Sequence, residues 1–532
     1  MYRSAGPQIR GGESLCMLRL SNQAVHCQDD RFDLLCALDW NNFQRFESEI
    51  PLDKNSTVVA DSKAGPMPEV LVKNGTDFQA LPLTETAKNV AGGRPNMVLL
   101  GRLAAFLNIP LEILTGEIRS RFSGKPDALL NAALSCAETG FAEGLDIYVE
   151  SLSPVPDHLD KRWMISGNEA AGLGALHAGV RFVAAYPITP ASEALEWMAP
   201  RLEELNGKLV QAEDELASIN MAIGAGYAGV PSLTATSGPG LALMVEGLGL
   251  ATASETPVTV LNVMRGGPST GIPTKSEQSD LNIALHGLHG DAPHLVTAAL
   301  SITDCAFTMA WTVGLTEALQ VPAIVLTDQA LGQSTGVVGE PRLPEPLQRR
   351  TADLVEQGYL RYQMTADGVS PMAIPGQPGN MYTADGLEHD ESGKPSTIAT
   401  DHARGLDKRL NKLRDFDYGP DWGEVHGEGD TAIVCFGSAA GAVNEAVERL
   451  NASGVTTKTV CIRLLSPLPQ SQIESLLTEC RRVIVVEQNH GAQFFHYLKG
   501  YLNWQVEPIS LARPGPLPLR PGEIVKFVTE QL

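Results

Sequence analysis

Residues 183–193, Val-Ala-Ala-Tyr-Pro-Ile-Thr-Pro-Ala-Ser-Glu, join a short apolar run to a turn bracketed by two prolines and then to a helical pattern. The apolar residues 182–185 predict a strand, and apolar side chains recur at helical spacing from Ala194 to Leu202. The prolines stiffen the turn and hold the Thr189 hydroxyl at the carboxyl end of the strand, where open α/β sheets bind ligands. The alternative is that Thr189 or Ser192 only caps the following helix.

The alternation of strand and helix continues along the middle of the chain. Strands separated by helices of about 10–15 residues predict a doubly wound parallel sheet covered on both faces. The expected strands are 182–185, 208–212, 232–235, 258–264 and 323–327, and the expected helices are 169–178, 191–205, 215–228, 241–253 and 305–319.

Polar residues follow each of these strands. Because the carboxyl ends of parallel strands share one edge of a sheet, we expect all of these residues along a single crevice. In strand order they are Thr189, then Glu213 and Glu215, then Ser237-Gly238-Pro239-Gly240, then Arg265-Gly266-Gly267, and finally Asp328-Gln329.

A linker-like stretch with two prolines, Leu152 to His158, and changes in residue composition and periodicity divide the chain. Residues 1–150 are expected to form an α/β unit with strands at 15–20, 34–38, 57–59 and 70–72 and helices at 96–107 and 126–144. The expected organisation is domain 1–150, linker 151–165, sheet domain 166–350, long loop 351–425 and C-terminal α/β domain 426–532. The loop shows no sustained periodicity, and both a lid and a solvated connector are compatible with it.

Composition excludes several classes of protein. The chain has 532 residues, a hydrophobic fraction of 43% and a formal net charge of −22, which argues against nucleic acid and anionic membrane as partners. With no apolar run of about 18 residues and no apolar signal region at Met1 to Gly6, we expect a cytoplasmic protein.

The 8 cysteines are scattered, and no C-x-x-C pair occurs. This spacing argues against zinc ribbons, redox pairs and cysteine-ligated iron–sulfur clusters in this chain. We expect buried, reduced thiols, so an iron–sulfur cluster would have to be held by another chain.

Three shorter patterns carry less weight. Residues 224–229 match G-x-G-x-x-G, but helix precedes them and a turn follows, so close helix packing is favoured over a dinucleotide site. Residues 267–271 match G-x-S-x-G without the helix that a nucleophile elbow needs. His286, His289 and His294 lie close in sequence without ligand spacing, which leaves a zinc site as a minor alternative.

Five motifs, in this order, resemble the α subunit of 2-oxoacid:ferredoxin oxidoreductases. They are Tyr186-Pro187-Ile188-Thr189-Pro190, Glu213-Asp214-Glu215, Thr236 to Gly240, Arg265 to Gly271, and Pro273-Thr274-Lys275-Ser276-Glu277-Gln278. The resemblance covers Gly167 to Leu532. It is weaker over 1–150, which is similar to the γ domain that is fused ahead of the α domain in this family. Among the variants of the family, the 2-oxoglutarate type is the most similar in overall sequence character. The family's γ domain opens well before its Arg-Gly-Gly segment, here Arg10 to Gly12, so the first βα unit is expected to be missing.

The resemblance implies an α/β fold of the thiamine-diphosphate pyrimidine-binding type with a C-terminal domain like that of transketolase. It implies an enzyme of class EC 1.2.7 that decarboxylates a 2-oxoacid with thiamine diphosphate, passes electrons through a [4Fe–4S] cluster to ferredoxin, and forms acyl-CoA from coenzyme A. A separate β subunit would hold the diphosphate, Mg²⁺ and the cluster, in a dimer of αβ heterodimers.

The resemblance also implies residue roles. Glu215 would contact the aminopyrimidine ring, with Ser237 and Gly238 beside the cofactor. Thr189, in the turn with Tyr186, Pro187 and Ile188, would hydrogen-bond the substrate. Arg265 and Lys275 are the cations near these motifs that could meet the carboxylates of a dicarboxylic substrate. We assign Arg265 to the proximal and Lys275 to the distal carboxylate, and the reverse assignment stays open.

Two alternatives stay open for the whole chain. A transketolase- or decarboxylase-type enzyme would need a complete diphosphate–Mg²⁺ motif, and Gly290-Asp291 is followed by Ala292. A non-catalytic assembly subunit could share the fold. Within the family, 2-oxoglutarate, pyruvate, branched-chain and aryl oxoacids all fit the motifs, and either physiological direction is compatible with them.

Overall fold

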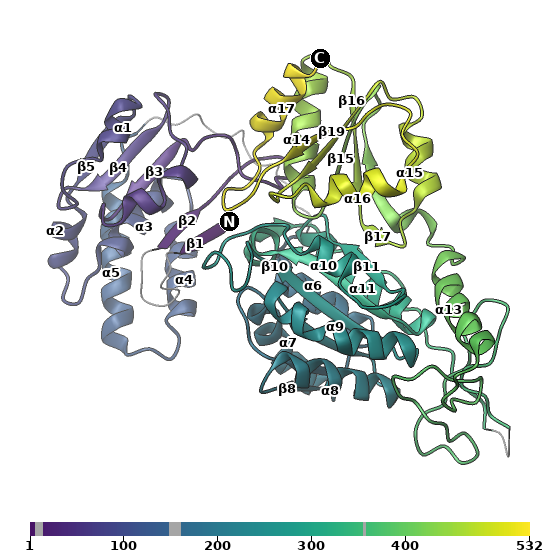
Figure 1. Cartoon of the computed structure of the whole chain (residues 1–532). Coiled ribbons are helices and arrows are strands. Elements are labelled where there is room, and N and C mark those ends of the chain that lie inside the picture. Colours follow the sequence, from purple (N-terminus) through teal and green to yellow (C-terminus); the bar gives the residue numbers. More distant parts are fainter. Residues whose placement is uncertain (6–13, 148–160, 355–357) are drawn as a thin grey trace. The chain divides into compact units, whose positions relative to one another are not determined.

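The computed structural model describes residues 1–5, 14–147, 161–354 and 358–532 (Figure 1). The chain divides into two compact units, one made of Met1–Gln28 with Pro156–Leu532 and the other of Asp29–Val155. From the sequence we assigned residues 1–150 to one domain, whereas the structure groups the first of these residues with the larger unit. The Arg-Gly-Gly segment at residues 10–12 and most of the expected linker lie outside the described residues.

Long-range polar contacts tie the N-terminal residues to the larger unit. The Met1 amino group donates to the Thr335 carbonyl over 2.7 Å, and the Tyr2 hydroxyl donates to Gln329 Oε1 over 3.1 Å. Arg19 donates to both oxygens of Glu445 at 2.7 and 2.9 Å. Because these partners lie far downstream, no local pattern around residues 1–28 predicts the grouping.

The smaller unit packs helices on a three-stranded parallel sheet of order β3-β4-β5. Helices α3 and α5 pack so closely that a Cβ on Gly101 would lie 2.0 Å from the Ala137 carbonyl oxygen. The elements are β3 (Leu34–Ala37), β4 (Thr57–Asp61), β5 (Asp77–Leu81), α1 (Glu69–Lys73), α2 (Leu83–Lys88), α3 (Pro95–Phe106), α4 (Leu111–Arg121) and α5 (Asp127–Glu143), with short 3₁₀ turns at Phe43–Arg45 and Glu47–Glu49.

One predicted strand in this unit is wrong. Residues 70–72 belong to helix α1, which begins directly after Pro68 and buries Leu71 while Val72 stays exposed. Proline is well tolerated beside the first helical turn, where the backbone N–H groups have no partner within the helix. The apolar run therefore belongs to a short helix in which Leu71 faces the core, and not to a strand.

The larger unit is built around a seven-stranded sheet of order β17-β11-β12-β10-β9-β7-β8. All neighbouring strands pair in parallel except β11 and β17, which are antiparallel. The strands are β7 (Phe182–Ala185), β8 (Lys208–Gln211), β9 (Ser232–Thr236), β10 (Val258–Met264), β11 (Leu295–Ala298), β12 (Pro322–Asp328) and β17 (Leu464–Ser466).

Helices connect these strands and enclose two apolar clusters of the larger unit, which confirms the predicted doubly wound α/β fold. The strand order reverses at β7, which lies between β8 and β9, so its carboxyl end is a topological switch point. The helices are α6 (Gly167–His177), α7 (Ser192–Glu204), α8 (Glu215–Tyr227), α9 (Gly238–Ala253), α10 (Leu281–His286), α11 (Ile302–Leu319) and α12 (Gln329–Gln333).

The C-terminal part of this unit is a second α/β layer structure with strand order β14-β16-β15-β18-β19. Its strands are β14 (Gly423–His426), β15 (Thr431–Phe436), β16 (Thr457–Ile462), β18 (Arg482–Glu487) and β19 (Ile509–Ala512), and its helices are α14 (Ala439–Ala452), α15 (Gln470–Leu477), α16 (Gln493–Tyr501) and α17 (Pro521–Glu530). Smaller pieces are a 3₁₀ turn at Gly419–Trp422 and the antiparallel pairs β1 (Tyr2–Ala5) with β2 (Ser14–Met17) and β6 (Trp163–Ser166) with β13 (Thr335–Val338).

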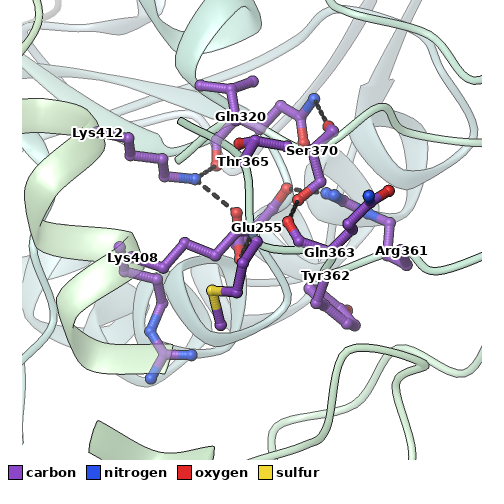
Figure 2. A network of polar contacts seen from close by, with 12 residues as sticks. Glu255, Gln320, Arg361, Tyr362, Gln363, Thr365, Ser370, Lys408 and Lys412 are labelled. Carbon is purple, nitrogen blue, oxygen red and sulfur yellow. Dashed lines mark hydrogen bonds and ion pairs between the residues drawn. The ribbon is translucent and has the colours of Figure 1, made fainter. Parts of the chain in front are cut away.

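The segment 351–425, expected to lack sustained periodicity, contains the 16-residue helix α13 (Ala399–Arg414). The buried face of α13 carries Lys408, Arg409, Lys412 and Leu413, so a search for apolar periodicity misses it. In Figure 2, Lys408 and Lys412 extend from this helix toward Glu255. Their ammonium groups lie 2.6 and 2.9 Å from the Glu255 carboxylate oxygens.

Glu255 and its neighbours connect four parts of the larger unit. The residue follows α9, and its main-chain carbonyl accepts a hydrogen bond from Arg361 Nη2 at 2.7 Å. Lys412 Nζ also donates to the Gln320 carbonyl, just after α11, at 2.9 Å. Gln320 Nε2 in turn donates to the Ser370 carbonyl at 2.8 Å. The long segment is therefore fixed to the sheet by buried charges (Figure 2).

Among the helices in the described ranges, none combines the length and apolar character needed to cross a membrane.

Candidate functional site

The Tyr186–Pro190 turn lies between β7 and α7, at the carboxyl edge of the seven-stranded sheet. Tyr186 and Pro187 are exposed, whereas Ile188 packs against the core. Arg265, directly after β10, donates from Nη1 to the main-chain carbonyl of Thr189 over 2.7 Å. The structure thus brings together two predicted site residues from separate motifs.

The Gly238-Pro239-Gly240 turn at the start of α9 lies between two buried carboxyl groups. A Cβ on Gly240 would lie 2.7 Å from Glu215 Oε1, and a Cβ on Gly238 would lie 2.4 Å from Asp280 Oδ1. A side chain at either position would therefore clash unless the facing carboxyl group moved. This turn, predicted from the sequence to lie beside the cofactor, packs directly against Glu215.

Glu215 is the first residue of α8 and is 7% exposed. The Asp214 carboxylate caps this helix by accepting from the Ala217 N–H at 2.7 Å, which leaves Glu215 free of that task. No hydrogen bond or ion pair to the Glu215 carboxylate occurs within the described part of the chain. A buried carboxylate in this condition is available to accept a hydrogen bond from a ligand.

Ser237 precedes the turn and is fully buried. Its hydroxyl has no hydrogen-bond partner among the described residues. Burying an unsatisfied hydroxyl costs about 1–3 kcal/mol, which a polar ligand at this turn could recover. Ser237 and Glu215 together therefore offer polar groups to which no other described residue forms a hydrogen bond.

Asp280 is a site residue that the motif analysis missed. Its carboxylate accepts from Asn262 Nδ2 at 2.9 Å, and the Ser279 hydroxyl lies 3.4 Å away. Burial raises its pKa to about 6, although the hydrogen bonds from Asn262 and Ser279 and the charge of Arg265 oppose the rise. The available signal in the sequence was its position two residues after the motif at 273–278.

Arg265 is partly buried, and desolvation lowers its pKa while the Asp280 charge opposes that change. Its Nε is buried without a hydrogen-bond partner among the described residues. A guanidinium has five N–H donors in a planar fork, and it remains charged in this setting. Arg265 can therefore receive a carboxylate while Nη1 holds the Thr189 carbonyl.

Lys275 lies in the loop that carries Glu277 and Gln278 and is 9% exposed. Its main-chain carbonyl accepts a hydrogen bond from the Gly266 N–H at 2.9 Å. This bond joins the backbone of the Lys275 loop to the backbone of the Arg265–Gly271 motif. Gln278 anchors the loop to the C-terminal layer by accepting from the Gln488 N–H and donating to the Phe436 carbonyl, both at 2.8 Å.

The structure argues against a functional role for two competing motifs. Gly226, in the G-x-G-x-x-G match, lies within α8, where a Cβ would be 2.2 Å from the Pro257 carbonyl oxygen, which confirms close packing. Ser269, in the G-x-S-x-G match, is exposed, and the next helix, α10, begins only at Leu281.

The described residues contain no group of three or more His, Cys, Asp or Glu arranged to hold a metal ion. Both ring nitrogens of His294 bond to main-chain carbonyls, of Ala292 at 2.8 Å and Ala284 at 2.7 Å. All the cysteines are free thiols: Cys136, Cys305, Cys435, Cys461 and Cys480 are buried, Cys27 and Cys36 are half-buried, and Cys16 is exposed. The exposed Cys16 differs from the expectation of buried thiols.

Three family models match consecutive parts of the chain. Residues 173–407 match "Pyruvate flavodoxin/ferredoxin oxidoreductase, thiamine diP-bdg". Residues 1–143 match "Pyruvate ferredoxin/flavodoxin oxidoreductase", and residues 429–509 match "Pyruvate:ferredoxin oxidoreductase core domain II". The candidate site residues thus lie within the part of the chain that matches the thiamine-diphosphate-binding model.

Individual proteins are similar over most of their length. The 2-oxoacid:ferredoxin oxidoreductase subunit alpha of Saccharolobus solfataricus is 33% identical over 79% of this chain and 68% of its own length. The 2-oxoglutarate synthase subunit KorA of Methanothermobacter thermautotrophicus is 33% identical over 70% of this chain and 99% of its own. A solved 2-oxoglutarate:ferredoxin oxidoreductase from Magnetococcus marinus, with 2-oxoglutarate, coenzyme A and succinyl-CoA bound, is 38% identical, with a TM-score of 0.87 over 96% of this chain and 90% of that chain.

Proposed function

This chain belongs to the 2-oxoacid:ferredoxin oxidoreductase family, and from that premise we propose that it acts on 2-oxoglutarate as the α subunit of such an enzyme. With a β subunit it would oxidatively decarboxylate the acid, form acyl-CoA and CO₂, and deliver electrons to ferredoxin. The observation that carries the proposal is the meeting of Arg265, Thr189 and the glycine turn beside Glu215 at one sheet edge.

The residues at this edge fit the pyrimidine end of thiamine diphosphate. The Glu215 carboxylate has no donor among the described residues and lies against Gly240. The Ser237 hydroxyl, also without a partner in the described part of the chain, is buried beside Gly238. An aminopyrimidine ring needs a carboxylate at a ring nitrogen and polar partners for its amino group. Glu215 would hold that ring, and Ser237 with the Gly238 backbone would flank it.

The chemistry supplied by bound thiamine diphosphate is attack on the 2-oxo carbon and storage of the electron pair released on decarboxylation. Glu215 would hold or release a proton at the ring nitrogen. The Thr189 hydroxyl would donate to a substrate oxygen, a hydrogen bond worth about 1.5–3 kcal/mol when the acceptor is charged. The turn Tyr186-Pro187-Ile188 would set the position of Thr189.

Charge recognition would fall to the two cations. A buried carboxylate needs a cationic partner, because an unpaired ion in a low-dielectric crevice is strongly destabilised. Arg265 would bind the carboxylate adjacent to the 2-oxo group, and Lys275 the distal carboxylate of a dicarboxylic acid. Lysine acts as a point charge without a bidentate grip, so this distal pairing would be less selective than one with arginine.

The partners follow from the family. Relatives are named as α subunits, so we propose a β subunit that holds the diphosphate, Mg²⁺ and the [4Fe–4S] cluster, in a dimer of αβ heterodimers that reduces ferredoxin. The complex, assayed with coenzyme A, an artificial acceptor and a panel of 2-oxoacids, should turn over 2-oxoglutarate with the highest kcat/KM. A higher kcat/KM for pyruvate would overturn the substrate assignment.

Purified without a β subunit, the chain is expected to show no iron–sulfur chromophore and no turnover. Cysteine ligands for clusters occur in compact spacings, and the cysteines here are scattered over the chain. Visible absorption spectra and iron analysis of the isolated chain check this expectation, with the α–β complex as the positive control. Stoichiometric iron in the isolated chain would contradict the proposed division of labour.

The change Glu215→Gln is expected to lower kcat of the α–β complex about hundredfold, the lower end of the range for a lost proton-transfer group. Glutamine keeps the size of the side chain but cannot take up the proton. A non-catalytic assembly subunit would tolerate the substitution, so near-normal kcat together with normal assembly would remove Glu215 from the proposed mechanism.

A further inference from the structure

Two consecutive carbonyl groups of the Tyr186–Pro190 turn accept hydrogen bonds from side chains of other elements. Arg265, which follows β10, donates to the Thr189 carbonyl over 2.7 Å. Asn168, the second residue of α6, donates from Nδ2 to the Pro190 carbonyl over 2.8 Å and is 1% exposed. The turn is therefore held on one side by a predicted site residue and on the other by a buried amide that belongs to none of the five motifs.

The orientation of the Asn168 amide is set by its neighbours. Its Nδ2 faces two acceptors, the Pro190 carbonyl at 2.8 Å and Glu193 Oε2 at 3.4 Å, so the NH₂ group must lie on this side. Its Oδ1 packs against Gly332, where a Cβ would lie only 2.7 Å away. The amide is thus confined between the start of α7 and α12, and it cannot turn over without losing both hydrogen bonds.

A line of hydrogen bonds holds Glu193 in turn. Gln333 Nε2 donates to Glu193 Oε1, and Gln329 Nε2 donates to Gln333 Oε1, each at 2.9 Å. The Tyr2 hydroxyl donates to Gln329 Oε1 at 3.1 Å. These side chains connect β1, α12 and α7 to Asn168, so the carboxylate that orients the Asn168 amide is itself fixed in place.

We propose that Asn168 is a positioning residue that fixes the Pro190 carbonyl and thereby aims the Thr189 hydroxyl at the 2-oxoacid. The proposal rests on the function proposed above, in which Thr189 contacts the substrate. Asn168 acts through Thr189 and not by contact with the substrate, because its amide bonds to Pro190 and Glu193. A buried carbonyl that loses its donor is destabilised, so without Asn168 the turn shifts toward another partner and carries Thr189 with it.

The first test is Asn168→Ala in the α–β complex. A misplacement of about 1 Å can cost about hundredfold in rate, so kcat/KM for 2-oxoglutarate should fall by about tenfold to hundredfold. Pyruvate should lose the same factor, since the oxygens that Thr189 could contact are common to both acids, while KM for coenzyme A should stay as in the wild type. A wild-type kcat/KM for both acids would overturn the proposal.

A double-mutant cycle with Thr189→Val separates positioning from a general loss of structure. Valine is similar in size to threonine but lacks the hydroxyl. If Asn168 acts through that hydroxyl, Asn168→Ala should lower kcat/KM much less in the Thr189→Val background than in the wild type. Equal factors in the two backgrounds would show that Asn168 does not act through Thr189.

The matched control is Asn380→Ala in the long segment 351–425. Asn380 is 2% exposed and donates from Nδ2 to the Asp353 carbonyl over 2.8 Å, so this variant loses a hydrogen bond of the same kind. Both alanine variants should lower the Tm, whereas only Asn168→Ala should lower kcat/KM. An equal loss of kcat/KM in Asn380→Ala would assign the effect of Asn168 to stability alone.

Glu193→Ala provides a second variant in case Asn168→Ala does not fold. Glu193 is exposed on α7, and alanine is favourable in a helix. The change removes an acceptor that orients the Asn168 amide, so kcat/KM should fall severalfold in the wild type and much less in the Thr189→Val background. Unchanged kinetics in Glu193→Ala would then overturn the proposal, whereas absence of 2-oxoacid turnover in the wild-type complex would refute the proposed function.

Discussion

Replacing Glu255 with glutamine is expected to reduce the free energy of unfolding by about 3–5 kcal/mol, the range for removing one partner of a buried ion pair. Lys408 and Lys412 have side chains only 3% and 1% exposed, and both bond to this carboxylate. Arg361, fully buried, adds a third positive charge. Glutamine would leave these cations without a counter-charge, and chemical denaturation monitored by far-UV circular dichroism checks the loss.

The same network predicts an asymmetry among its members. Removing Lys412 as Lys412→Met leaves Glu255 paired with Lys408, so the loss should be smaller than for Glu255→Gln. The surface pair Lys499–Glu507, with side chains 43% and 75% exposed, provides the control. Exposed ion pairs contribute about 0–1 kcal/mol, so Glu507→Gln should change little. Equal losses for Glu255→Gln and Glu507→Gln would show that the network is not an electrostatic anchor.

The contribution of Glu255 should also depend on pH in a defined direction. Burial opposes its ionisation, but Lys412, Lys408 and Arg361 together hold its pKa well below the ordinary value of 4.5. A carboxyl with a lowered folded-state pKa stabilises fully above its unfolded pKa and loses that contribution as the pH falls toward the folded one. The difference between wild type and Glu255→Gln should therefore shrink as the pH falls below about 4.5.

The parallel sheet was predictable because its strands are continuous apolar runs, a pattern that arises only when both faces are covered. The predicted strand 258–264 matches β10 residue for residue, and 182–185 matches β7. Local pattern also places the polar residues that follow each strand at one edge. Both the fold of the sheet and the meeting of Thr189 with Arg265 follow from that placement.

The parts that local pattern missed depend on tertiary pairing. Helix α13 buries Lys408, Arg409 and Lys412 and, in the same turns, a single leucine. The burial of these cations depends on the distant carboxylates of Glu255 and Glu388. Asp280 follows a polar run that was identified, but its contacts with Asn262 and Gly238 come from folding. Charges and hydrogen bonds that close over long sequence separations leave no periodic signal in the chain.

The substitution Arg265→Met is expected to cost about 3–5 kcal/mol of transition-state binding, or about 10²–10⁴-fold in kcat/KM, if Arg265 receives the carboxylate common to all 2-oxoacids. Methionine keeps length and apolar bulk while removing the charge. The loss should be similar for pyruvate and 2-oxoglutarate, since both carry that carboxylate. Steady-state kinetics of the α–β complex with each acid provide the measurement.

Lys275→Met separates the two carboxylates of a dicarboxylic substrate. If Lys275 meets the distal group, this change should lower kcat/KM for 2-oxoglutarate by a similar factor and leave pyruvate almost unaffected. Arg265→Lys serves as the charge-retaining control and should recover part of the loss in Arg265→Met, because lysine supplies the charge without the bidentate fork. The ratio of the two acids across these three variants therefore assigns each cation to a carboxylate. Small, equal losses in both methionine variants would mean that neither cation meets substrate, and the counter-charge would then have to come from the β subunit.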